Sequence, residues 1–405
     1  MTQSNSPRRV NSIRADRTAR AASAFMDYYT KSAYAKRKAG PNPPRFDFVT
    51  GNPFELPMPA MVEAITHALQ PKHPLWYAYS MNETASCELA ASSLTKRLGL
   101  RFDPEDVLMT TGAFSAMEVA FKLVADPGDE IIVMTPWFFL YPTVFEGASV
   151  EAVKVPLGPQ FELDLPAIRK AIGPRTRGIL INSPHNPTGR LVRPEELKEL
   201  AEILTEASAA QGRPVYLISD EAFSRIVYDG RTFETPVAAY PHSILIYTYG
   251  KQLLAPGERI GFVALPSTMP EADRKALRDP MFHMAIGSGF CFPNSTLQRA
   301  LPEIDALSID VAHLQGNRDL FRDELTKVGY EVVVPEGTFF MLVKAPMPDD
   351  LEFSEILAQH DIFVTPGTMC LAHGYLRVSL CSLRDTVRDS LPGWRRAFEQ
   401  VRSPR

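Results

Sequence analysis

Short apolar segments that alternate with helical stretches are the feature that most limits how this chain can fold. Each apolar segment is about five residues long, which is the usual length of a buried strand. Strands that alternate with helices form a mostly parallel sheet with helices on both faces. The sequence therefore predicts an α/β fold, with strands near residues 130–134, 151–156, 178–182, 215–219, 243–248 and 260–265.

The pattern changes after about residue 285, where a long helical segment at 308–328 is followed by short strands near 331–334, 338–343 and 375–380. A chain of 405 residues is too long for one simple core, so we expect two domains. The expected division is a large domain at 65–285 and a smaller α+β domain made of 41–64 and 286–405.

The first 40 residues are expected to form a flexible basic arm, because their arginines are not accompanied by an apolar segment. No run in the chain approaches the roughly 18 apolar residues of a membrane-spanning helix. We therefore expect a cytoplasmic protein. The arginines of this arm are Arg8, Arg9, Arg14, Arg17 and Arg20.

Composition excludes several classes of partner. The formal net charge is −4, and 22% of the residues are charged, so nothing indicates binding to nucleic acid or to an anionic membrane. The four cysteines form no CxxC pair, which favours reduced thiols over a disulfide or a metal site. They are Cys87, Cys291, Cys370 and Cys381.

Lys251 lies among turn-forming residues on the connection between two predicted strands, shortly before Arg259. A lysine held beside cationic or desolvating groups can lose its proton and condense with an aldehyde. Arg259 offers a planar fork for phosphate oxygens, and Thr248 adds a hydroxyl. Taken alone, such a pair is more often a solvated lysine and an ordinary ion pair, so the interpretation depends on the segments that precede it.

Two upstream segments favour a binding site. The sequence Asn182-Ser183-Pro184-His185-Asn186-Pro187-Thr188-Gly189 follows an apolar strand, and its prolines and glycine fix a turn that presents Asn186. The strand near 215–219 ends in Asp220. An aspartate at a strand end can pair with a protonated pyridine nitrogen and so keep the ring an electron sink.

In this order the segments resemble a fold-type I pyridoxal-phosphate enzyme of the class I/II aminotransferase family, in its aspartate-aminotransferase-like branch. The resemblance extends from Gly51-Asn52-Pro53 to Gly374-Tyr375-Leu376-Arg377-Val378-Ser379. It implies a mostly parallel seven-stranded sheet covered by helices, a pyridoxal 5'-phosphate cofactor, and a homodimer with shared active sites.

The resemblance also implies roles for individual residues. Lys251 carries the aldimine and moves the proton, and Asp220 meets the ring nitrogen. Asn186 donates to the ring oxygen, whereas Arg259 and Thr248 bind the phosphate. The same phosphate is expected at a helix start with free N–H groups, formed by Gly112, Ala113 and Phe114.

Further positions concern the ring, the substrate and the second subunit. Phe138 is expected against the cofactor ring, with Trp137 as the alternative. Tyr79 is expected to reach the partner subunit's phosphate, with Tyr77 competing for that role. His283 and Phe282 are candidates for the side-chain pocket, although a buried structural histidine is the more common case.

Arg377 lies inside an apolar strand, where an arginine is costly unless a carboxylate or a backbone acceptor meets it. The resemblance implies that Arg377 holds the substrate α-carboxylate and that the backbone of Gly51 approaches the same group. The alternative is a surface arginine on an edge strand.

Three positions depart from the family pattern. Phe223 replaces the usual tyrosine, Gly250 replaces a serine or alanine, and the segment 79–86 lacks an Ala-Gly turn and the arginine that follows it. The expected activity is amino-group transfer between an L-amino acid and a 2-oxo acid. The alternatives are elimination, cyclisation or oxidation on the same cofactor, and a non-catalytic effector-binding protein.

Overall fold

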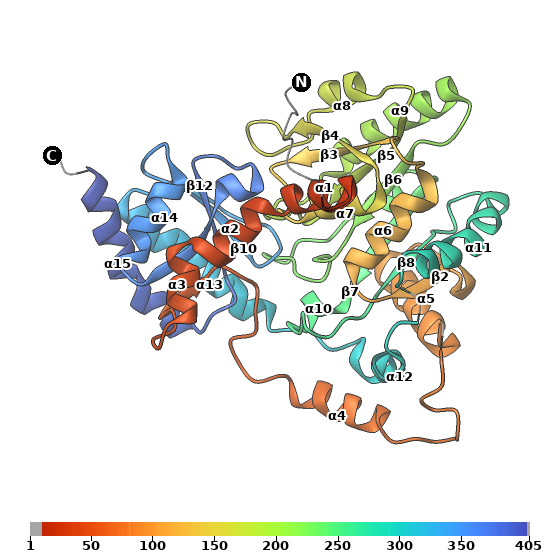
Figure 1. The fold of residues 1–405 in the computed structure, drawn as a ribbon, viewed down its shortest axis with the longest axis horizontal. Helices are drawn as coiled ribbons and strands as arrows, with labels where there is room; N and C mark the ends of the chain where they lie inside the picture. The colour runs from red at the N-terminus through yellow and green to blue at the C-terminus, as the bar shows by residue number, and fades with distance from the viewer. Residues whose placement is uncertain (1–9, 81, 291, 403–405) are drawn as a thin grey trace, which may run out of the picture.

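The computed structural model describes residues 10–80, 82–290 and 292–402 and arranges them around two sheets (Figure 1). The larger sheet has seven strands in the order β2-β8-β7-β6-β5-β3-β4. All of its pairings are parallel except those of β8, which runs antiparallel to β2 and β7. This confirms the predicted α/β fold. The strands are β2 (Val107–Thr110), β3 (Glu130–Thr135), β4 (Glu151–Pro156), β5 (Thr176–Asn182), β6 (Tyr216–Asp220), β7 (Ser243–Thr248) and β8 (Gly261–Ala264).

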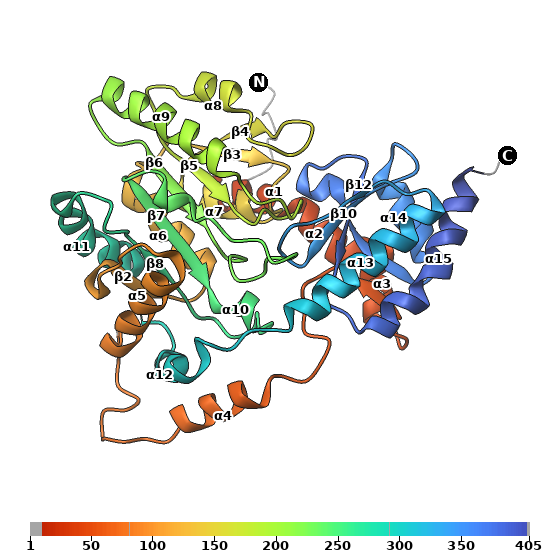
Figure 2. The same cartoon turned by 180° about the vertical axis from the view of Figure 1, so that it is seen from behind.

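Helices cover both faces of this sheet because consecutive side chains of a strand point to opposite sides. Leu180 of β5 packs in one apolar cluster with α6 and α7, whereas its neighbours Ile179 and Ile181 pack in another with α9. Figure 2 shows α8 and α9 on one side of the sheet and α6 and α7 behind it. The covering helices are α5 (Thr84–Leu98), α6 (Ala113–Val124), α7 (Tyr141–Ala148), α8 (Leu165–Ala171), α9 (Pro194–Gln211) and α11 (Glu271–Gly287).

The smaller sheet has five strands in the order β1-β11-β12-β10-β9 and a separate apolar core. Its first strand, β1 (Phe46–Phe48), pairs in parallel with β11 (Ile362–Pro366), so the chain begins this sheet before it enters the larger one. The two sheets agree with a large and a small unit, while the domain boundaries stay a prediction. The other elements here are β9 (Val332–Val333), β10 (Phe340–Lys344), β12 (Tyr375–Ser379), α13 (Val311–Val328), α14 (Asp350–Ala358) and α15 (Arg384–Arg402).

The segment predicted as an arm is largely helical and lies against both units (Figure 1). Arg17 forms ion pairs with Glu146 at 2.8 Å and Glu151 at 2.9 Å, beside the large sheet. The Tyr28 hydroxyl donates to the Val364 carbonyl of the small sheet at 2.7 Å. Tyr34 of the third helix is buried, whereas the first two helices have no buried residue. Residues 1–9 lie outside the described residues. The helices are α1 (Ile13–Ala21), α2 (Ser23–Lys31) and α3 (Ala33–Ala39).

Of the remaining helical elements, α4 and α12 lie on the connections between the two units, α10, η1 and η2 lie within the large unit, and η3 lies within the small one. They are α4 (Pro59–Ala68), α10 (Tyr249–Gln252), α12 (Ser295–Ile304) and the short 3-10 helices η1 (Pro104–Asp106), η2 (Pro236–Ala238) and η3 (Gly367–Cys370).

Cys87, Cys370 and Cys381 are buried free thiols, and Cys291 lies outside the described residues. Within the described ranges, every helix is too short or too polar to cross a membrane. The same ranges contain no cluster of three or more His, Cys, Asp or Glu side chains that could hold a metal ion.

Candidate active site

A cavity of about 340 Å³ lies where the ends of β5, β6 and β7 meet the small sheet. The carboxyl ends of neighbouring parallel strands lie at one edge of a sheet, which is where ligands bind in open α/β folds. The N-terminus of α6, the segment after β3 and the helix α2 complete the wall. Residues far apart in the sequence therefore face one space.

Lys251 faces this cavity from α10, a single turn that begins directly after β7. Thr248 caps this turn, and its hydroxyl oxygen accepts from the Gly250 N–H at 3.4 Å. Burial lowers the pKa of Lys251 to about 8, and the charges of Arg259 and Arg377 act in the same direction. About a tenth of the amine is thus unprotonated at pH 7, far more than for an ordinary lysine, and the unprotonated form is the nucleophile.

Asp220 ends β6 and faces the same cavity. Its Oδ2 accepts from the Tyr141 hydroxyl at 2.7 Å, and its Oδ1 accepts from the Ala222 N–H at 3.1 Å. Burial raises the pKa of Asp220, whereas these two donors lower it. A cationic N–H presented to this carboxylate from the cavity would stabilise its ionised form.

The opposite part of the cavity is built to receive an anion. Gly112 precedes α6 at a φ of 93°, and no side chain caps the helix, so its first N–H groups are available beside Ala113 and Phe114. Arg259 lies directly against this turn, because a Cβ at position 112 would be 2.5 Å from its Nη2. The Arg259 Nη1 donates to the Pro256 carbonyl at 2.8 Å, which fixes the guanidinium.

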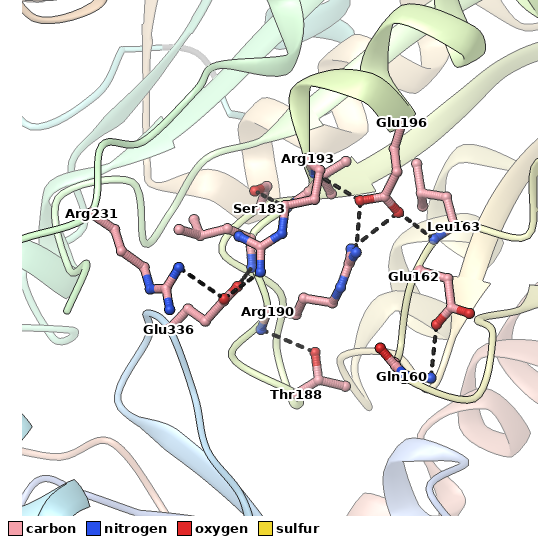
Figure 3. Close-up of polar contacts among 12 residues, drawn as sticks. Gln160, Glu162, Leu163, Ser183, Thr188, Arg190, Arg193, Glu196, Arg231 and Glu336 are labelled. Carbon is pink, nitrogen blue, oxygen red and sulfur yellow. Dashed lines mark hydrogen bonds and ion pairs between the residues drawn. The ribbon is translucent and has the colours of Figure 1, made fainter. Parts of the chain in front are cut away.

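The turn that carries Asn186 is held in place from both sides. The Asn186 N–H donates to the Asn182 side-chain oxygen at 2.7 Å, and the Arg190 N–H donates to the Thr188 hydroxyl oxygen at 3.3 Å. The Arg190 guanidinium makes a two-pronged contact with Glu196, as Figure 3 shows.

Glu336 ties the segment after this turn to the loop before β10. It forms ion pairs with Arg193 and Arg231 and accepts from the Leu191 N–H at 3.0 Å (Figure 3). Position 186 is therefore fixed relative to both sheets.

Arg377 is buried in β12 and faces the cavity. Its guanidinium lies 4.0 Å from the ring centroid of Phe340 and 4.9 Å from that of Phe139. It donates to the Asn186 oxygen at 3.4 Å and to the Val49 carbonyl at 3.2 Å, and its buried Nε has no hydrogen-bond partner. Burial lowers the pKa of Arg377. Among the described residues no carboxylate forms an ion pair with it, so an acid from solution can do so.

The other predicted positions divide into two groups. Gly51, Phe138 and Phe223 line the cavity, and a Cβ at position 51 would be 1.9 Å from the Phe339 ring. The alternative Trp137 is buried elsewhere, with the Lys154 amine 4.9 Å from its ring centroid. Four other predicted residues do not line the cavity: Tyr77, Tyr79, Phe282 and His283.

The structure shows what surrounds Phe223 and Gly250, two residues that depart from the family pattern. The Phe223 ring meets the Phe339 ring edge-on with centroids 5.0 Å apart, and the Lys251 amine is 5.7 Å from the centroid of the Phe223 ring. A Cβ at Gly250 would lie 3.2 Å from the Pro256 Cα, so the loop after α10 passes close to this position. A side chain at position 250 would therefore require the 253–256 loop to shift slightly.

Sequence reasoning missed several residues of the cavity. Tyr141 is the partner of Asp220, and Phe139 covers Arg377. Their signal was the aromatic run Trp137-Phe138-Phe139, which continues to Tyr141. Phe25 and Tyr29 also line the cavity, from α2, and their spacing of one helical turn was the only available signal.

Comparisons with known proteins show which family this chain resembles. The family model for aminotransferase class I and II matches residues 46–391. A probable aspartate/prephenate aminotransferase of Thermus aquaticus is 30% identical over 320 residues, which cover 77% of this chain and 81% of that protein.

Solved structures match over nearly the whole length. An amino transferase from Eubacterium rectale superposes with a TM-score of 0.83 at 26% identity, covering 97% of each chain. The aspartate aminotransferase of Thermus thermophilus with maleate gives a TM-score of 0.79 at 26% identity, covering 96% of this chain and 100% of that one.

Proposed function

This chain belongs to the aminotransferase class I and II family, and from that premise we propose that it moves an amino group between an L-amino acid and a 2-oxo acid, with pyridoxal 5'-phosphate held in the cavity. The observation that carries the proposal is the meeting of three groups in one cavity: the Lys251 amine with its pKa lowered to about 8, the Asp220 carboxylate, and the Arg377 guanidinium without a carboxylate partner among the described residues.

The donor groups fit this cofactor. Arg259, Thr248 and the free N–H groups at the start of α6 would hold the phosphate, and the glycine at 112 leaves room for the close approach of Arg259. Asp220 would hold the ring nitrogen and Asn186 the ring oxygen. Phe138 supplies an aromatic face for the ring. Pyridoxal phosphate supplies an aldehyde that takes up the amino group and a ring that withdraws electrons from the reacting carbon.

The residues of this chain would move protons, bind the substrate and exclude water. With the cofactor bound, the Lys251 amine would hold its aldehyde carbon and would move the proton that leaves the substrate α-carbon. Asp220, oriented by the Tyr141 hydroxyl, keeps a proton on the ring nitrogen. Arg377 binds the substrate α-carboxylate, and Gly51 lets its backbone approach the same group. The aromatic side chains keep water away from the reacting carbon.

We also propose a cytoplasmic homodimer whose sites are completed across the two-fold axis. Support comes from Tyr79, whose side chain is 93% exposed and contacts the exposed Phe292 at 5.6 Å. Leu56 and Leu75 are also exposed. Such apolar side chains are typical of an interface. Light scattering of the purified protein would give twice the 45.1 kDa chain mass.

Product analysis tests the proposed activity. The holoenzyme is given a panel of amino acids with one 2-oxo acid, and the new amino acid, the new 2-oxo acid and ammonia are quantified. Transfer yields the two products in equal amounts without ammonia. Elimination, cyclisation or oxidation, the alternatives that Phe223 and the segment 79–86 leave open, would break this equality. Spectral changes without products for any donor would indicate an effector-binding protein.

A further inference from the structure

One wall of the cavity is a continuous aromatic surface that includes the helix α2. The Phe25 ring stacks on the Phe139 ring, with centroids 5.4 Å apart and planes inclined by 14°. Tyr29 lies one helical turn after Phe25, with ring centroids 4.5 Å apart. The Phe139 ring in turn lies 4.9 Å from the Phe138 ring. All four residues line the cavity.

This aromatic wall, formed by Phe25, Tyr29, Phe138 and Phe139, lies directly beside Arg377. The Arg377 guanidinium is 4.9 Å from the Phe139 centroid, and its charge opposes the burial that raises the pKa of Tyr29 to about 12. A substrate whose α-carboxylate is bound by Arg377 therefore meets this wall with the rest of its structure.

The charged groups of the described cavity wall are already assigned. They are Asp220, Lys251, Arg259 and Arg377. Under the proposed function, Asp220 and Arg259 hold the cofactor, Lys251 reacts, and Arg377 holds the α-carboxylate. A second carboxylate on the substrate would find no further cation among these residues, so in the proposed homodimer only a cation of the second chain could pair with it. Without such a cation it would lose its hydration against aromatic rings, which is costly for a charge without a partner.

We propose that the amino donor is an uncharged aromatic amino acid, whose ring packs on Phe25, Tyr29 and Phe139 of the aromatic wall, while Phe138 faces the cofactor ring. The inference rests on the proposed function and specifies its substrate. Aromatic rings favour offset-stacked or edge-on contacts with other rings, which an aliphatic side chain cannot make. Phe25 and Tyr29 are therefore specificity-determining residues, and they contribute no proton transfer.

A substrate panel tests the proposal on the wild-type holoenzyme. We expect kcat/KM for the best of phenylalanine, tyrosine and tryptophan to exceed that for aspartate and glutamate by about a hundredfold or more. It should also exceed that for leucine. A preference for a dicarboxylic or an aliphatic amino acid would overturn the inference and leave the proposed function intact. Absence of transfer for every donor would instead count against the proposed function.

Binding without turnover gives a second readout. The holoenzyme is titrated calorimetrically with 3-phenylpropanoate and with butanedioate. Both compounds have one carboxylate for Arg377 and no amino group, so neither can react. The first adds an aromatic ring and the second adds another carboxylate. We expect 3-phenylpropanoate to bind at least about tenfold more tightly, the scale of one buried aromatic contact. Tighter binding of butanedioate would reveal a cation that serves the side chain and would overturn the inference.

Substitutions in α2 test whether the aromatic wall causes the preference for aromatic donors. Phe25→Ala should lower kcat/KM for phenylalanine by about tenfold and weaken 3-phenylpropanoate equally, with alanine as donor changed less than about twofold. Phe25→Leu, which keeps apolar volume in case the smaller residue unfolds the helix, should reduce phenylalanine turnover and spare leucine. Met26→Ala is the matched control, since Met26 is exposed on the same helix and does not line the cavity. Equal losses for phenylalanine and alanine would contradict the role of Phe25.

Discussion

The two sides of the cavity differ in where their side chains originate and in what they carry. The reaction side consists of Asp220, Lys251 and Arg259, which stand at the ends of neighbouring strands of the large sheet and bear charge. The aromatic wall carries no charge and combines α2 with a segment that follows β3. Strand order alone brings the first set together, whereas the second requires the N-terminal helices to fold across both sheets. The chemistry and the choice of substrate thus depend on different parts of the architecture.

Removing the amine of the reaction side should have the largest effect. Lys251→Ala should lower single-turnover transfer by about a thousandfold or more, because no other described residue of the cavity wall carries an amine. It should also abolish the visible absorbance that the bound cofactor gives with lysine. Lys198→Ala, on the exposed face of α9, is the control and should retain full activity. Substantial transfer by the Lys251 variant would sink the assignment.

Arg377 stands between the two sides, and its replacement tests how they cooperate. Arg377→Lys keeps the charge but loses the planar fork between the Phe139 and Phe340 rings. It should cost roughly 2–3 kcal/mol of substrate binding, seen as a higher KM for every donor. Arg402→Lys, on an exposed position of α15, serves as the control. An unchanged KM for all amino acids tested would make Arg377 a structural residue.

A change at Phe223 sharpens the description of the reaction side. A hydroxyl here would donate to the cofactor ring oxygen and favour the form in which that oxygen is anionic. Phe223→Tyr should therefore lower the pH midpoint of the visible absorbance band by about one unit, the equivalent of one hydrogen bond. Titration of the wild type and the variant decides the point. No shift, or an upward one, means that residue 223 is not beside the cofactor.

The smallest expected effect concerns the attachment of the aromatic wall. Tyr28→Phe removes the hydrogen bond from α2 to the Val364 carbonyl. Local opening of the N-terminal helices should become about fivefold more frequent, which is the value of roughly 1 kcal/mol. Limited proteolysis within residues 10–40 measures this opening, with Met26→Ala for comparison. Equal cleavage rates in the variant and the wild type would show that other contacts hold α2.

The sequence placed the residues of the reaction side next to apolar strands that could be recognised locally, and these residues do line one cavity. Asp220 ends one such strand, whereas Lys251 and Arg259 lie on the connection between two others. β2 and β11 were not found, since their apolar segments are short and carry no period that distinguishes a strand from a helix. Tyr141 and Phe25 were missed for another reason. Tyr141 contacts Asp220 and Phe25 contacts Phe139, and both partners are far away in the sequence. The pattern of residues within one segment does not reveal such long-range pairs.

The attachment of α2 to both sheets has a consequence for inheritance of function within the family. The matched stretch, residues 46–391, contains every charged residue of the cavity wall, whereas Phe25 and Tyr29 lie upstream of it. With the role that we propose for Phe25 and Tyr29, mutations in residues 13–39 are expected to alter the accepted amino acid while the charged residues of the cavity stay unchanged. Similarity within residues 46–391 therefore indicates the reaction type more directly than the substrate. Exchange of this one segment between relatives is therefore expected to change the preferred donor.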